Sequence, residues 1–133
     1  MLYLASAIGD APVYIVHLST KEGLEEIRQA KKRGQKHIGV ETCPQYLLLT
    51  DDLYDDPSEG LKAVMAPPLR KPADNEALWD GLKNDEIDTV ATDHCPFTFK
   101  KQKQQGADDF TKCPSGAPGV EERLSLLYSE GVC

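Results

Sequence analysis

Three short apolar segments, each ending in polar residues and each followed by a segment of helical character, constrain the fold of this 133-residue chain most strongly. The segments are PVYIVH at residues 12–17, IGVET at 38–42 and IDTVAT at 87–92. The first is rich in β-branched and aromatic residues and does not alternate, which is typical of a parallel strand buried on both faces. The order strand, helix, strand, helix, strand, helix predicts successive right-handed βα units of the α/β class.

Helix signals follow each of the three segments. Ser19 and Glu22 have the spacing of a capping box, and Gly34 supplies a left-handed stop after the helix that they begin. Asp74 can cap a second helix, and Gly131 can end a third. The apolar faces that we expect in these helices are Leu24, Ile27 and Ala30, then Ala77, Leu78 and Leu82, then Val120, Leu124, Leu127 and Tyr128.

Charge and cysteine content exclude several classes of protein. A formal charge of −7 opposes binding to a phosphate backbone, so nucleic acid is not an expected partner. No apolar run approaches the roughly 20 residues that span a bilayer, so we expect no membrane contact and a cytoplasmic location. The cysteines, Cys43, Cys95, Cys113 and Cys133, form no C-x-x-C pair, and we expect free thiols. Cys43 and Cys95, each before a proline, are expected to be small buried residues.

Polar residues stand where the predicted strands end. His17 ends the first strand, Glu41 lies near the end of the second, and Asp93 and His94 follow the third. His17 and Asp93 are suitable ligands for a divalent metal, and in a barrel of parallel strands chemistry resides at this rim. Each also has a structural alternative, His17 as a hydrogen-bonded residue at a strand end and Asp93 as the cap of a turn.

Five blocks of the sequence resemble consecutive blocks of the dihydropyrimidinases and bacterial D-hydantoinases, which are cyclic amidohydrolases. They are VYIVHLST at 13–20, ETCPQYLLLT at 41–50, APPLRKPADNEALW at 66–79, TVATDHCPF at 89–97 and TKCPSGAPGVEERL at 111–124. The blocks follow in order over nearly the whole chain. The resemblance implies a partial (β/α)8 TIM-type barrel of the amidohydrolase superfamily, made of about the last three βα units, strands 6 to 8.

The resemblance also implies a cofactor and a reaction. Family members hold two divalent metals, usually zinc, bridged by a carboxylated lysine and a hydroxide. By resemblance, His17 ends the sixth strand and binds the second metal, while Asp93 ends the eighth, binds the first metal and shuttles a proton as the catalytic residue. The implied reaction is hydrolytic opening of a dihydropyrimidine or a 5-substituted hydantoin to an N-carbamoyl amino acid, as in pyrimidine catabolism.

Two positions depart from the family pattern. Ala66 stands where relatives commonly have serine in S-P-P-L-R, and Ser115 stands where they commonly have asparagine in P-N-G. In the family both loops bind the ureide ring, largely through backbone groups. The resemblance therefore implies that Ala66 and Ser115 are substrate-binding positions, with a substrate preference that these exchanges can shift.

By resemblance, the other metal ligands lie upstream of Met1. We therefore expect residues 1–133 to be a single fragment of the hydrolase barrel domain, without the N-terminal barrel strands and the β-sandwich domain. A catalytic zinc site needs roughly three or four protein ligands. This chain alone is thus expected to hold no binuclear centre and to be inactive. Exposed strand edges predict self-association or a homo-oligomer.

Other functions stay open at this point. Within the same fold the chain could derive from an allantoinase or a dihydroorotase, or from a non-catalytic dihydropyrimidinase-related protein. The architectural alternative is a small open α/β sheet covered on both faces. It corresponds to a free-standing α/β binding module in which His17 and Asp93 are structural.

Overall fold

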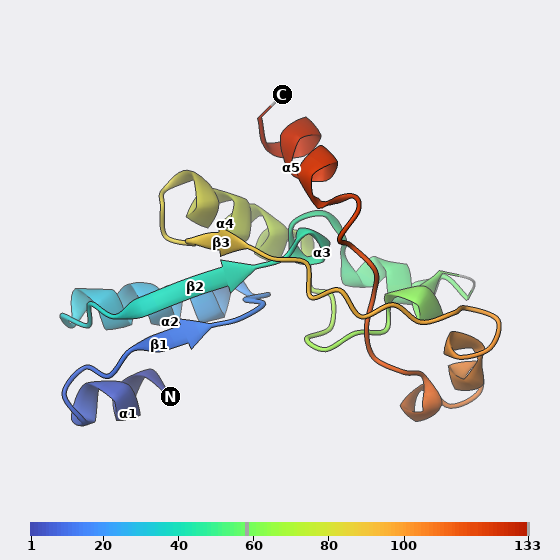
Figure 1. The fold of residues 1–133 in the computed structure, drawn as a ribbon, viewed down its shortest axis with the longest axis horizontal. Coiled ribbons are helices and arrows are strands. Elements are labelled where there is room, and N and C mark those ends of the chain that lie inside the picture. Colours follow the sequence, from blue (N-terminus) through green and yellow to red (C-terminus); the bar gives the residue numbers. More distant parts are fainter. Residues whose placement is uncertain (58, 133) are drawn as a thin grey trace.

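The computed structural model describes residues 1–57 and 59–132, and its centre is a three-stranded parallel sheet of order β1-β2-β3. Val13 pairs with Ile38 between β1 and β2, and Glu41 pairs with Thr89 between β2 and β3. The α-helices and strands are α1 (Leu2–Ala7), β1 (Val13–Ile15), α2 (Lys21–Lys32), β2 (Ile38–Thr42), α3 (Pro44–Leu48), α4 (Pro72–Lys83), β3 (Thr89–Val90) and α5 (Arg123–Gly131) (Figure 1). The predicted α/β class and the succession of parallel βα units are confirmed.

A second part of the molecule, which we call the loop cluster, lies beyond the C-terminal ends of the strands (Figure 1). It consists of residues 51–57, 59–70 and 97–116 and contains short 3-10 helices. These are η1 (Asp51–Asp55), η2 (Gly60–Ala63), η3 (Lys103–Gly106) and η4 (Phe110–Lys112). The chain thus leaves the sheet after β2 and again after β3, and the two excursions pack against each other.

Helix α2 has the predicted buried face but a different cap. Leu24, Ile27 and Ala30 are all buried. The N-cap is Thr20, whose hydroxyl accepts a hydrogen bond from the Gly23 amide at 3.0 Å, so the predicted Ser19 capping box is wrong. Ser19 is itself buried, and its hydroxyl faces the Arg70 side chain rather than the helix end.

Helix α4 begins at Pro72, and its start is joined to that of α2 by Asp74. The Asp74 carboxylate accepts from the backbone amide of Lys71 at 3.1 Å and from that of Lys21 at 2.9 Å. A carboxylate near two helix N-termini also interacts favourably with both helix dipoles. The prediction that Asp74 caps α4 is confirmed in part. Its side chain accepts a hydrogen bond from the backbone amide of the N-cap residue, Lys71, but Asp74 itself lies in the first turn of the helix.

Helices α2 and α4 cover one face of the sheet, where they share a core with β2. On β2 the buried residues are Ile38, Val40 and Thr42, which alternate with partly exposed neighbours. Tyr14 on β1 is 51% exposed, and Val16, the residue after this strand, is 47% exposed. The prediction that the first strand is buried on both faces is therefore wrong for this chain, and so is the alternative of a sheet covered on both faces. Tyr14 lies over Gly39 instead, where an added Cβ would come within 2.6 Å of the ring.

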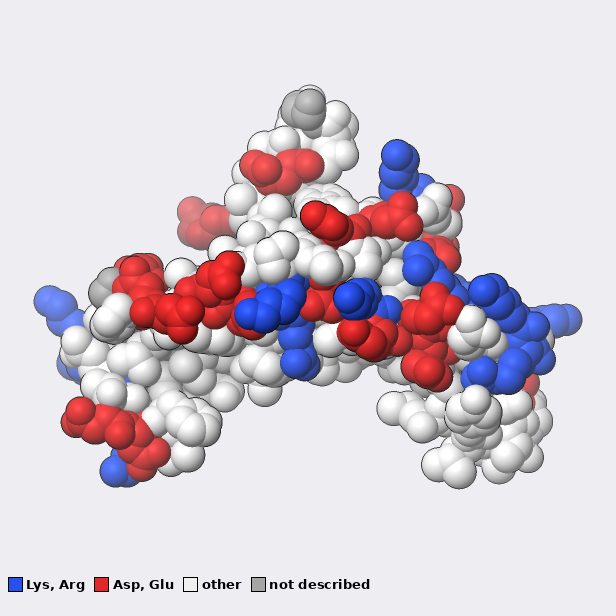
Figure 2. Space-filling model, turned by 180° about the vertical axis from the view of Figure 1, so that it is seen from behind, with Lys and Arg blue, Asp and Glu red and all other residues white. Residues whose placement is uncertain are grey.

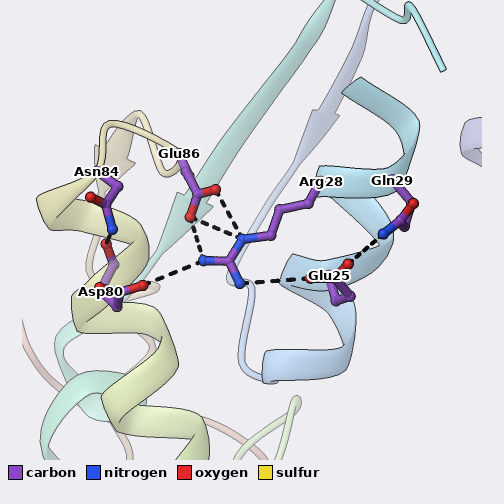
Figure 3. A network of polar contacts seen from close by, with 6 residues as sticks. All are labelled: Glu25, Arg28, Gln29, Asp80, Asn84 and Glu86. Atoms are coloured by element: carbon purple, nitrogen blue, oxygen red, sulfur yellow. Dashed lines mark hydrogen bonds and ion pairs between the residues drawn. The ribbon is translucent and has the colours of Figure 1, made fainter. Parts of the chain in front are cut away.

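Arg28 on α2 links this helix to the segment that leads into β3 (Figure 3). Its Nε donates to both carboxylate oxygens of Glu86, at 2.9 and 3.0 Å. Its guanidinium also lies 3.6 Å from the Asp80 carboxylate and 3.7 Å from that of Glu25. The hydrogen-bonded Arg28 holds the pKa of Glu86 below its ordinary value.

Helix α5 is less buried than its sequence predicts. Val120, Leu124 and Tyr128 are 61%, 75% and 63% exposed, so the predicted apolar side of this helix does not join the core. Leu127 alone among the four predicted residues packs against the core, as a partly buried side chain. A helix with an apolar stripe normally buries it, and Val120, Leu124 and Tyr128 of this stripe have no cover within the described residues.

Acidic and basic side chains are interspersed in a belt across the face shown in Figure 2. Surface without acidic or basic side chains remains above and below the belt, interrupted by acidic side chains near the top and by a charged group at the lower left of this view. Within residues 1–57 and 59–132, no helix has the length and hydropathy needed to cross a membrane. Cys43, Cys95 and Cys113 are free thiols, and Cys133 lies outside the described residues.

Candidate functional site at the C-terminal end of the sheet

His17 and Asp93 lie at the same end of the sheet, on either side of β2. His17 follows β1 and Asp93 follows β3, and parallel strands end at a common edge. The Leu18 amide donates to the Glu41 carbonyl at 2.7 Å, which fixes the residue after His17 against β2. The Ala91 amide donates to the Thr42 carbonyl at 2.9 Å, which fixes the other side. The topology thus brings together two residues that are 76 positions apart in the sequence.

Both residues have a left-handed backbone, with φ of +40° at His17 and +49° at Asp93. Non-glycine residues rarely adopt positive φ, and such strain concentrates at functional sites. Asp10 and Asp85 also have positive φ, but they lie in the turns shortly after α1 and α4, where helices commonly end this way. His17 and Asp93 instead lie shortly after strands, so helix ends do not explain their conformation.

The side chains at this edge differ in burial. His17 is partly buried and Asp93 is exposed. Glu41 accepts a hydrogen bond from the Tyr14 hydroxyl at 2.9 Å, so its carboxylate is held on the open face of the sheet. His94 is engaged structurally, because its Nδ1 accepts from the backbone amides of Gly119 at 3.1 Å and Val120 at 3.3 Å. The side chains of His17 and Asp93, in contrast, make no hydrogen bond or ion pair within the described residues.

The donor set of the described chain is too small for a complete catalytic zinc centre. No group of three or more His, Cys, Asp or Glu side chains suited to a metal ion occurs in residues 1–57 and 59–132. One imidazole and one carboxylate fit part of such a centre, whereas catalytic zinc uses about three protein ligands. Further donors would have to come from outside these residues.

Cys43, at the end of β2, is a buried neutral thiol. It is fully buried, and burial raises its pKa to about 12, helped by the nearby carboxylates of Glu41 and Asp93. A thiol in this state is a poor nucleophile, as expected for a structural residue. Cys95, in contrast, is exposed, so the expectation that it is buried is wrong. Its segment has left the sheet, and its amide pairs with the Ala117 carbonyl at 2.9 Å.

The loops of Ala66 and Ser115 lie side by side at the base of the loop cluster. The carbonyl of Val64 accepts from the Gly116 amide at 3.0 Å. The Tyr46 hydroxyl donates to the Pro67 carbonyl at 2.8 Å, and the Ala66–Pro67 peptide is cis. Ala66 and Ser115 are exposed, and their backbone amides and carbonyls have no hydrogen-bond partner among the described residues. The two loops therefore offer unpaired main-chain groups, which a polar ring can bind.

A pocket of about 730 Å³ opens beside these loops. Ser115 and Met65 line it together with Tyr54, Leu61 and Phe110. Its lining is mainly apolar, and sequence reasoning did not find it. The separate segments that form it, 54–57, 60–68 and 107–115, carry no periodic pattern that would predict their contact.

Comparisons with known proteins identify the relatives of this chain. No protein-family model matches it. It is 48% identical over 132 residues to D-phenylhydantoinases from Escherichia coli O81 (strain ED1a) and from Escherichia coli (strain K12 / DH10B). The match includes 99% of this chain and 28% of each relative. The chain is homologous to part of the hydantoinases and dihydropyrimidinases.

Solved structures of this hydantoinase and dihydropyrimidinase family have the same fold over the matched region. A D-hydantoinase superposes with a TM-score of 0.93 at 42% identity, and the dihydropyrimidinase from Brevibacillus agri NCHU1002 with 0.93 at 44%. The L-hydantoinase from Arthrobacter aurescens superposes with 0.85 at 34%. In each case 98% of this chain matches 28% of the solved chain. The chain thus spans little more than a quarter of its relatives.

Proposed function

We propose that this chain is the part of a cyclic amide hydrolase that contributes strands 6 to 8 of a (β/α)8 barrel. The proposed reaction is hydrolytic opening of a dihydropyrimidine or a 5-substituted hydantoin to an N-carbamoyl amino acid. The observation that carries the proposal is the pair His17 and Asp93, which lie at the same end of the sheet, on either side of β2, in strained left-handed backbone. Barrel enzymes place their chemistry at this edge.

In the proposed site His17 and Asp93 are two ligands of a divalent-metal centre, which other parts of the polypeptide or another chain complete. A bound divalent metal would polarise the substrate carbonyl and lower the pKa of water. The Asp93 carboxylate accepts a proton from the attacking water and returns it to the departing ring nitrogen. The Leu18 amide bonds to the Glu41 carbonyl, so the backbone that carries the His17 imidazole is fixed against β2.

The ring of the substrate lies against the loops of Ala66 and Ser115. A ureide ring carries alternating N–H and C=O groups, which match the unpaired main-chain groups of these residues. Alanine for serine at position 66 and serine for asparagine at position 115 then change substrate binding little, because the backbone and not the side chain makes the contact. The 133-residue chain by itself is inactive in this proposal, since it offers two metal donors.

A segment-exchange enzyme tests the proposal. Residues 1–133 replace the matching segment of the 48% identical E. coli D-phenylhydantoinase, and hydrolysis of 5-phenylhydantoin, dihydrouracil, allantoin and dihydroorotate is measured. We expect activity on the first two, and its loss in His17→Asn and Asp93→Asn with a lower metal content. His37→Asn and Asp85→Asn are matched controls, because both are exposed and Asp85 shares the positive φ of Asp93.

Two results would contradict the proposal. If His17→Asn and Asp93→Asn retain metal and activity as the controls do, the ligand assignment is wrong. If allantoin or dihydroorotate is the preferred substrate, the substrate class is wrong. A tightly bound metal pair with dihydrouracil turnover in the purified 133-residue chain would refute its expected inactivity.

A further inference from the structure

Lys103, at the start of η3, is a buried lysine without an acidic partner among the described residues. The residue is 3% exposed, and its Nζ donates to the Val64 carbonyl at 2.6 Å. The Nζ also lies 5.7 Å from the centre of the Phe97 ring. Burial lowers its pKa, and the neighbouring Cys113 and Cys95 only partly offset this effect. Burying an ammonium group without a carboxylate is unfavourable, so the contact that it makes requires a reason.

That contact lies between the two loops of the proposed substrate site. The Val64 carbonyl accepts from Lys103 Nζ and from the Gly116 amide, so one oxygen ties three segments together. Val64 is two residues before Ala66, and Gly116 is one residue after Ser115. Lys103 therefore reaches the point at which both loops are joined. On the far side of the cis peptide, the Tyr46 hydroxyl holds the Pro67 carbonyl.

The backbone of Lys103 is itself fixed. Its amide donates to the Thr98 carbonyl at 3.2 Å, and the following Gln104 amide donates to the Phe99 carbonyl at 3.0 Å. Close packing of Gly106 against Cys113 holds the end of η3, because an added Cβ there would come within 2.4 Å of the Cys113 side chain. The Lys103 ammonium group is thus attached to a segment whose backbone is fixed. A compact donor on a long stem suits a single carbonyl acceptor.

We propose that Lys103 is a positioning residue that sets the spacing between the Ala66 and Ser115 backbones and thereby the binding of a cyclic ureide. This inference rests on the proposed function, because it takes these two loops to bind the substrate ring. Lys103 does not touch the substrate in this arrangement. It acts through the Val64 carbonyl, so its loss changes binding of the ring more than the chemical step.

The test combines a structural and a kinetic measurement on Lys103→Met, which keeps the length of the side chain and removes the donor. Lys62→Met is the matched control, because Lys62 lies in the same loop cluster, 5.4 Å from the Phe99 ring, but is half-exposed. In the purified 133-residue chain we expect hydrogen exchange of the Gly116 amide to accelerate about tenfold in Lys103→Met and to stay unchanged in Lys62→Met. Unchanged Gly116 exchange in Lys103→Met would overturn the inference.

In the segment-exchange enzyme we expect Lys103→Met to raise KM for dihydrouracil about tenfold with kcat within about threefold. A loss of kcat at constant KM would overturn the positioning role. An inactive enzyme with Lys103 intact would refute the proposed function instead, while Gly116 exchange would still decide whether Lys103 joins the loops. If Lys103→Met fails to fold, Lys103→Gln keeps a neutral donor without the buried charge, and it should show the same two effects at smaller size.

Discussion

The link between Arg28 and Glu86 allows a quantitative test of how the βα units hold together. We expect a double-mutant cycle of Arg28→Met and Glu86→Gln to give a coupling free energy of about 1–2 kcal/mol. Hydrogen bonds to charged groups contribute about 1.5–3 kcal/mol, and exposed ion pairs contribute about 0.2–1 kcal/mol. Both side chains are 29% exposed and the contact is bidentate, so the coupling should lie from the top of the second range to the lower part of the first.

Glu25 supplies the matched control for this cycle. It lies 3.7 Å from the same guanidinium, and its side chain is 49% exposed. The coupling between Arg28 and Glu25 should therefore be about 0.3 kcal/mol, as for an ordinary exposed pair on one helix. Urea unfolding followed by circular dichroism, at one fixed protein concentration, gives the free energies for all variants.

The pH dependence gives a second criterion for the same pair. Glu86 has a lowered pKa in the folded state, so its contribution is present above its unfolded pKa, near 4.3, and is lost as the pH falls through the folded pKa. The Arg28–Glu86 coupling should therefore be present at pH 7 and disappear at strongly acidic pH. A coupling no larger than that of Arg28 with Glu25, or one unchanged by acid, would refute the reasoning.

Two further substitutions probe the core and the end of β2. Gly81→Ala should lower the free energy of unfolding by about 1 kcal/mol in urea titrations, because the new Cβ would lie 2.9 Å from Leu24 and 3.0 Å from Ile87; a gain in stability, as helix propensity alone predicts, would show that the contact relaxes. Cys43 has a folded pKa raised to about 12 from 9.0, so its stabilisation is lost as the pH rises above about 9. Between pH 8 and pH 10 the wild type should lose about 1 kcal/mol more than Cys43→Ala, and equal losses would contradict this.

The sequence predicted the features that depend on local pattern. Leu24, Ile27 and Ala30 are spaced for one helix face, and that face is buried because the strand beside it supplies Val40. The position of His17 and Asp93 at one sheet edge also follows from pattern, since parallel strands must end together. Their roles as metal ligands, like those of Ala66 and Ser115 as substrate contacts, stay predictions.

Features that depend on distant contacts could not be predicted in this way. Thr20 rather than Ser19 caps α2, because the choice depends on where Arg70 and the core lie. The exposure of Tyr14 on β1 depends on what covers the open face of the sheet, which no local pattern records. In the sequence, Lys103 forms a basic cluster with Lys100 and Lys101, which is typical of solvated side chains. Only the structure, in which two loops fold around Lys103, shows that this residue is buried.

Asp74 is synthesised well after α2, the earlier helix whose start it completes. Its carboxylate completes the start of α2 through the Lys21 amide, a contact across 53 positions of sequence. Chains emerge from the ribosome at about 5–20 residues per second, so the first turn of α2 waits several seconds for this acceptor. Until then the Lys21 amide must donate its hydrogen bond to water. The first turn of α2 is therefore fully hydrogen-bonded only after the following βα unit has been synthesised.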